Sequence, residues 1–156
     1  MPVQVRSELR RISVFASRIQ KLAQHVLLAA GEPRAELSLL LIGDSRMRRL
    51  NRRYRGRDAP TDVLAFSSRE AGGPASSLLG DVVISLPQAS RQARAGRRSL
   101  DDELATLLIH GVLHLLGYDH ERSDREARRM HRKEQAIWRA LAPPPKLIKE
   151  RSWRAQ

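Results

Sequence analysis

Three of the chain's five histidines fall within eleven residues, in the stretch HGVLHLLGYDH from His110 to His120. His110 and His114 are four positions apart, so on a helix they lie one turn apart on the same face. Gly117 comes where such a helix should end, and a glycine there can turn the chain back so that His120 returns toward the other two. Three neutral imidazoles with one open coordination position are typical of a catalytic metal site rather than a structural one.

Two explanations do not involve a metal. The histidine spacing could arise by chance, and buried imidazoles can form hydrogen bonds with backbone carbonyls. However, residues 104–116 are apolar nearly all round, which predicts a central buried helix in which two unpaired imidazoles would be costly. Cysteine is absent, so His, Asp and Glu are the only strong ligands. Metal binding accounts for all three histidines, whereas His25, alone on another predicted helix, is expected to be a surface or core residue.

The residue after the first histidine bears on the substrate. Metzincin proteases share this histidine spacing, but they carry a glutamate there as general base, and this chain has Gly111. Three neutral ligands leave the charge of an ion uncancelled, so the site should attract an anion, and a phosphodiester fits better than a peptide. Because glycine costs about 1 kcal/mol in a helix relative to alanine, we expect Gly111 to leave room for something passing close to the metal.

Arginine dominates the charge. The formal net charge is +12, and 25 of the 29 basic residues are arginine, which predicts a polyanionic partner. Genomic coding bias or a merely solvated surface are the alternative explanations. The expected nucleic-acid contacts lie in two clusters, which are Arg46, Arg48, Arg49, Arg52, Arg53, Arg55 and Arg57, and Arg91, Arg94, Arg97 and Arg98.

Apolar periodicity and turn residues predict the elements that must hold these side chains. A helix is expected over residues 12–30, and a helix from Asp44 or Ser45 should turn Met47, Leu50 and Tyr54 inward. Ser99 and Ser123 are expected to cap the histidine helix and a last helix that ends near residue 141. Strands are expected over residues 35–43, 63–66 and 79–86, the last two antiparallel, with a Gly/Pro/Ser-rich loop at 69–77 and a helix from residue 87.

The size and hydropathy of the chain predict one domain without a membrane segment. It has 156 residues, and no run approaches 18 apolar residues. Its N-terminus lacks the apolar core of a signal peptide, so we expect a cytoplasmic protein.

Four blocks together resemble the YbeY family of bacterial endoribonucleases, which act in ribosomal RNA maturation. They are HGVLHLLGYDH, its extension DREARRMHRKEQAIW, LNRRYRGRDAPTDVLAF and LGDVVIS, and they cover about half of the chain. The resemblance implies a single α+β domain over residues 1–142, with a mixed sheet of about four strands packed by about five helices and the metal-binding helix in the centre. Residues 143–156 are expected to form a basic, disordered tail.

The resemblance also implies a site and an activity. One divalent metal ion, expected to be zinc, would be held by His110, His114 and His120, and Arg55 and His114 would be catalytic. The implied activity is that of a single-strand-specific, metal-dependent endoribonuclease in small-subunit ribosomal RNA processing and ribosome quality control. Its partners would be ribosomal RNA and the small ribosomal subunit, with no membrane and no small-molecule cofactor.

Some points stay open at the level of sequence. Arg57, Thr61 and Asp62 match the same block as Arg55, and Asp62 is as well suited to bonding its own loop. Where the family often has Ser-Phe-Pro, residues 65–67 are Ala-Phe-Ser. Three imidazoles also accept nickel or copper, and either water or the RNA 2′-hydroxyl could be the nucleophile. A non-catalytic ribosome-assembly factor with a structural metal, or a metallohydrolase of another substrate, are the alternative functions.

Overall fold

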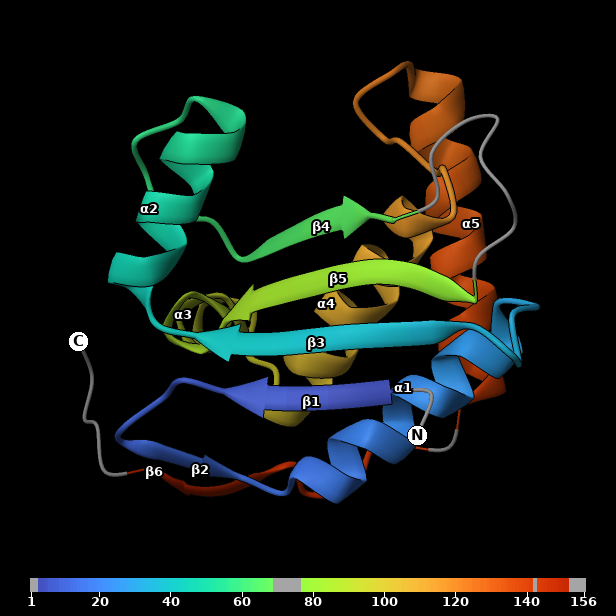
Figure 1. The fold of residues 1–156 in the computed structure, drawn as a ribbon. Helices are drawn as coiled ribbons and strands as arrows, with labels where there is room; N and C mark the ends of the chain where they lie inside the picture. The colour runs from blue at the N-terminus through green and yellow to red at the C-terminus, as the bar shows by residue number, and fades with distance from the viewer. Residues whose placement is uncertain (1–2, 69–76, 142, 152–156) are drawn as a thin grey trace.

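A computed structural model describes residues 3–68, 77–141 and 143–151 of the chain (Figure 1). Most of the predicted loop at 69–77 lies outside these residues. In chain order, the elements are β1 (Val3–Ser7), β2 (Ile12–Val14), α1 (Ala16–Ala29), β3 (Glu36–Ile42), α2 (Asp44–Arg55), β4 (Val63–Ser67), β5 (Leu78–Ser85), α3 (Leu86–Ala95), α4 (Leu100–Leu115), α5 (Asp124–Ala140) and β6 (Ile148–Arg151).

The main sheet is mixed and has four strands in the order β1-β3-β5-β4. Strand β3 runs parallel to both β1 and β5, and β4 pairs antiparallel with β5. The antiparallel pairing of β4 with β5 confirms the sequence prediction, and β4 forms the sheet edge nearest to α2 in Figure 1. Strand β1 was not anticipated by the sequence analysis.

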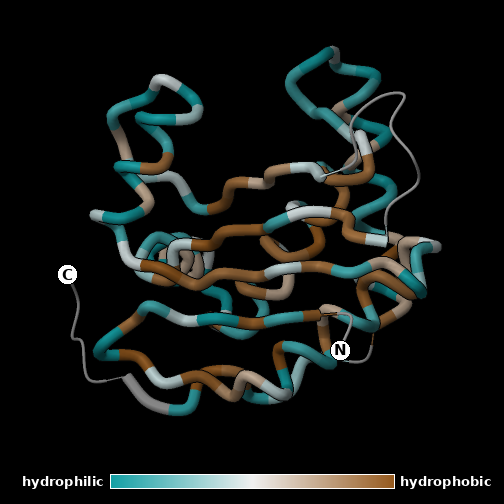
Figure 2. The backbone as a smooth tube through the Cα atoms, viewed as in Figure 1, coloured by the Kyte–Doolittle hydropathy of each residue, from teal (hydrophilic) through white to brown (hydrophobic). Residues whose placement is uncertain are grey.

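Helices cover the two faces of this sheet unequally. The larger core joins α1, α3 and α4 to one face, with α5 packed on α4 (Figure 1). The second core is small and lies on the other face, where Met47 of α2 packs against Ile42, Leu64 and Val83. Figure 2 shows this contrast, since α4 and the inner strands are mainly hydrophobic whereas α2 is mainly hydrophilic. The predicted α+β fold with a central histidine helix is therefore confirmed.

Helices α4 and α5 both begin at the serine caps that the sequence predicts. The Ser99 hydroxyl accepts a hydrogen bond from the Asp102 N–H at 3.0 Å, and Ser123 caps α5 by accepting from the Glu126 N–H at 3.1 Å. Eleven of the sixteen residues of α4 are buried. Such a helix can orient a side chain firmly, because most of its surface is fixed by packing.

The helix expected over residues 12–30 begins later than predicted. Ile12–Val14 form β2, which pairs antiparallel with β6, and α1 begins only at Ala16. The apolar residues of this segment fit a helical period, but two of the first three are β-branched and find a strand partner near the other end of the chain.

The segment after residue 142 is only partly described, and disorder is the wrong prediction for its middle. Leu147 and Ile148 are buried, at 0% and 5% exposure. Their backbone N–H groups donate to Asp101 Oδ1 at 2.8 and 3.2 Å. The polar composition of the segment gave no sign that these two apolar residues are buried. Residues 152–156 lie outside the described part of the chain.

Candidate metal centre

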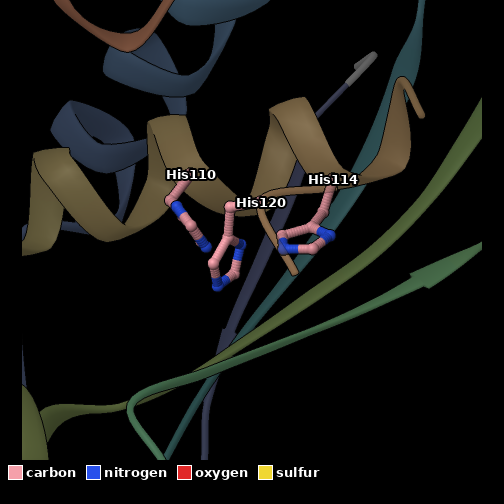
Figure 3. A group of neighbouring side chains, drawn as sticks. All are labelled: His110, His114 and His120. Atoms are coloured by element: carbon pink, nitrogen blue, oxygen red, sulfur yellow. The ribbon is translucent and has the colours of Figure 1, made fainter. Parts of the chain in front are cut away.

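The three histidines of the sequence motif converge. His110 and His114 project from α4, and His120 comes from the segment that follows it (Figure 3). One ring nitrogen from each lies within 4.8 Å of those of the other two. The ring centroids are 4.9 to 5.3 Å apart. These nitrogens can therefore hold a single metal ion.

The turn after α4 is what brings His120 back. Gly117 has a φ of +98°, in the left-handed region that favours glycine. The Tyr118 N–H donates to the Leu113 carbonyl at 3.0 Å, and Asp119 Oδ1 accepts from the Glu121 N–H at 2.9 Å. The chain thus reverses over three residues, as the position of the glycine predicts.

The surroundings of His114 favour its neutral form. Burial, followed by the neighbouring rings of His110 and His120, lowers the pKa of His114 below its ordinary value, and Arg55 contributes in the same direction. A neutral imidazole keeps a nitrogen lone pair that can bind a metal, so the lowered pKa of His114 is compatible with metal binding.

A carboxylate that the sequence analysis assigned no role lies beside the trio. His110 Nδ1 is 2.9 Å from Glu134 Oε2 of α5, and both side chains are 23% exposed. The sequence signal for it is weak but present, since Glu134 lies four residues after Met130 and three before Ile137, the two buried residues of α5.

A cleft of about 320 Å³ opens at the trio. Arg55 at the end of α2 lines it, and one guanidinium nitrogen of Arg55 lies 3.8 Å from Glu121 Oε2, next to His120. The structure thus brings the arginine singled out by the sequence to the same cleft as the histidines. The full lining is Asn51, Arg55, Arg57, Thr61, Asp62, Val63, Leu64, Ala65, His110, Gly111, His114, His120 and Glu121.

Asp62 is tied to its own loop as well as lining the cleft. Its Oδ1 accepts from the Val63 N–H at 2.8 Å and from the Thr61 hydroxyl at 3.3 Å. These bonds match the structural alternative considered for a turn aspartate.

The structural reason for a glycine at position 111 differs from the one expected. Gly111 lines the cleft, but a Cβ there would lie 2.7 Å from Val82 Cγ1 of β5 and 3.4 Å from Val63 Cγ2. The glycine lets α4 approach the sheet closely, so the space beside it is filled by valine rather than left free.

The eleven arginines expected to contact RNA differ in their surroundings and in their ion-pair partners. Arg55 and Arg57 line the cleft. Arg91 forms an ion pair of 2.7 Å with Asp44, whereas Arg98 contacts Glu103 and donates to the Thr106 hydroxyl. Six of the eleven lie within 4.0 Å of a carboxylate, namely Arg46, Arg48, Arg52, Arg55, Arg91 and Arg98. Among the described residues, no carboxylate partner is found for Arg49, Arg53, Arg57, Arg94 or Arg97.

The structure also bears on the expectations for Tyr54, for His25 and for a membrane segment. Tyr54 is 56% exposed and is not part of an inward stripe, because Asn51 takes the buried place and Tyr54 instead packs edge-on against Phe66 at 5.2 Å. His25 is exposed on α1 and lies outside the histidine trio, as predicted. No helix among the described residues is long and apolar enough to cross a membrane.

Comparison with known proteins adds independent information. Residues 4–142 match the family described as "Endoribonuclease YbeY". Relatives of that name include one from Anaeromyxobacter sp. (strain Fw109-5), 52% identical over 90% of this chain and 72% of the relative, and one from Geobacter metallireducens, 43% identical over 90% and 96%. The relative from Aquifex aeolicus is 41% identical over 86% and 89%. A solution structure of a Thermotoga maritima protein has the same fold, with a TM-score of 0.56 at 23% identity over 87% of this chain and 89% of that one.

Proposed function

The chain belongs to the YbeY family of endoribonucleases, and from that premise we propose that it cleaves single-stranded ribosomal RNA at a divalent metal held by His110, His114 and His120. The observation that carries this proposal is the meeting of the histidine trio and Arg55 in one cleft. The cleft has a volume of about 320 Å³, and we propose that it receives one nucleotide of an unpaired strand.

The donor set fits a metal ion. Three ring nitrogens lie within 4.8 Å of one another, and among the described residues no carboxylate belongs to this group. Three histidines with an open position are the ligand set of catalytic zinc sites, so we propose zinc. When bound, the ion would supply a Lewis acid for a phosphoryl oxygen and lower the pKa of a water.

Arg55 and Arg57 would bind the phosphate that enters this cleft. A guanidinium donates two parallel hydrogen bonds to a phosphate, which the single ammonium of lysine cannot copy. Among the described residues, Arg55 and Arg57 are the only arginine or lysine side chains that line the cleft, and its acidic groups are those of Asp62 and Glu121. The two arginines are therefore the groups that stabilise negative charge as it builds on the non-bridging oxygens.

The partner proposed for this activity is ribosomal RNA in the small ribosomal subunit, during processing and quality control. Its backbone would contact the two arginine clusters at residues 46–57 and 91–98, in the first place the arginines without a carboxylate partner among the described residues, because these lose no ion pair when RNA binds. Because the proposed substrate is bacterial ribosomal RNA, the proposed location is the cytoplasm.

Single-turnover cleavage of a single-stranded RNA at saturating protein tests the proposal. We expect cleavage by the zinc-loaded chain, loss after chelation and loss in His114→Ala. Arg55→Ala and Arg55→Lys should lower the rate on the order of 10²-fold, about 2.7 kcal/mol, with little change in zinc content.

Arg49→Ala is the matched control, because Arg49 lies on the same helix, is exposed and does not line the cleft. It should weaken RNA binding slightly and leave the saturated rate unchanged. Equal effects of the Arg49 and Arg55 substitutions, or RNA binding without any cleavage, would contradict the proposal and favour an assembly factor.

A further inference from the structure

Helix α5 brings one carboxylate to the histidine trio. Glu134 Oε2 lies 2.9 Å from His110 Nδ1. Within the described part of the chain, this imidazole is the only hydrogen-bonding or ion-pairing partner of the Glu134 side chain. Burying part of a carboxylate that has no arginine or lysine partner costs desolvation free energy, and the hydrogen bond to His110 offsets part of that cost.

Packing fixes the place of this carboxylate. Met130 and Ile137 of α5 are both 1% exposed, and Glu134 lies between them at helical spacing. Since the two neighbours anchor α5 in the main core, the carboxylate is held on the inward side of the helix rather than free to swing into solvent.

The bond also decides which nitrogen of His110 is free. A carboxylate can only accept, so Nδ1 must carry the proton when the imidazole is neutral, and Nε2 keeps its lone pair. Figure 3 shows the ring of His110 directed into the space shared with His114 and His120. Neither of these two has a carboxylate as close among the described residues, since the nearest is Glu121 at 4.0 Å from His120 Nε2.

We propose that Glu134 is a positioning residue of the metal centre, whose carboxylate holds His110 in the Nδ1-protonated form with Nε2 presented to the ion. This inference rests on the proposed metal-binding function of the trio. Carboxylates in this role orient a ligating histidine and raise its basicity, and their loss typically lowers metal affinity by about 10- to 100-fold.

The test uses two readouts that do not depend on RNA cleavage. Zinc affinity is measured by competition with a chromophoric chelator, and the tautomer of His110 is read by nitrogen-15 NMR of the metal-free chain at a pH where the ring is neutral. Glu134→Ala should lower zinc affinity about 10- to 100-fold and abolish the preference for the Nδ1-protonated form. Glu134→Gln keeps an uncharged acceptor and should fall between wild type and Glu134→Ala, which preserves the test if the alanine variant folds poorly.

Glu126→Gln is the matched control, because it removes the same charge from the first turn of α5, where Glu126 pairs with Arg129. It should bind zinc like wild type. Wild-type zinc affinity and an unchanged tautomer in the Glu134 variants would overturn the inference while leaving the proposed function intact. Failure of the wild type to cleave RNA would instead refute the proposed function, and a changed tautomer and zinc affinity would still support the role of Glu134.

Discussion

Replacing Gly111 with alanine should destabilise the chain or leave it unchanged, even though alanine is the better helix former. Alanine gains about 1 kcal/mol over glycine in a helix interior. Against this, the new Cβ would lie 2.7 Å from Val82 Cγ1 and 3.1 Å from Cγ2. To reach the 3.4 Å at which such contacts become ordinary, α4 must retreat by about 0.7 Å or Val82 must leave its rotamer, and overpacking of this kind costs about 1–3 kcal/mol.

The expected net change in the free energy of unfolding is therefore a loss of about 0–2 kcal/mol, measured by urea denaturation of the metal-free chain. Because α4 carries His110 and His114 while His120 lies beyond it, the same displacement should weaken zinc binding. Val82→Ala removes the obstructing methyl groups, so the Gly111→Ala/Val82→Ala double variant should show a favourable coupling of about 1 kcal/mol or more. A Gly111→Ala variant that gains the full helix-propensity benefit, without coupling to Val82, would refute this reasoning.

Three other predictions concern charge, pH and the C-terminal segment. The logarithm of the RNA association constant should fall by about 0.7 per phosphate contact for each unit in the logarithm of salt concentration; a flat salt response in filter binding would mean that the arginines only solubilise the surface. Because the folded state lowers the pKa of His114, the unfolded chain binds that proton more tightly, and the thermal midpoint of the metal-free protein should fall as pH drops through about 6.5. His114→Ala should make this fall shallower, and an identical pH profile would contradict it. Leu147→Ala should cost about 2–5 kcal/mol in urea denaturation because Leu147 is fully buried; an unchanged midpoint would show that this segment is not docked.

The histidine trio could be predicted from sequence because its geometry is local. Helical periodicity places His110 above His114, and a glycine turn of a few residues supplies the third ring. No long-range contact is needed to bring these side chains together. The strands β4 and β5 were predictable for the same reason, since alternation and turn residues are properties of short segments.

Features that depend on distant contacts were missed or assigned differently. The pairing of β2 with β6 joins segments near opposite ends of the chain, and neither segment is long enough to be recognised alone. Gly111 was interpreted from the helix alone, whereas its reason lies on β5 in the side chain of Val82. Glu134 is a charged residue on an amphipathic helix, and only the fold shows that it faces His110. In each case the deciding partner is remote in sequence.

A buried asparagine holds the segment that follows Arg55 at the end of α2. Asn51 Nδ2 donates to the Ala59 carbonyl at 2.8 Å, and the Arg57 N–H donates to the Asn51 carbonyl at 3.3 Å. These bonds hold the segment after α2 against the end of the helix, and the Arg55 guanidinium lies 3.8 Å from Glu121, which also lines the cleft. An incoming phosphate would therefore exchange with a carboxylate already beside the guanidinium. If Arg55 binds the phosphate as proposed, displacing this carboxylate costs little, because an exposed ion pair contributes only about 0–1 kcal/mol.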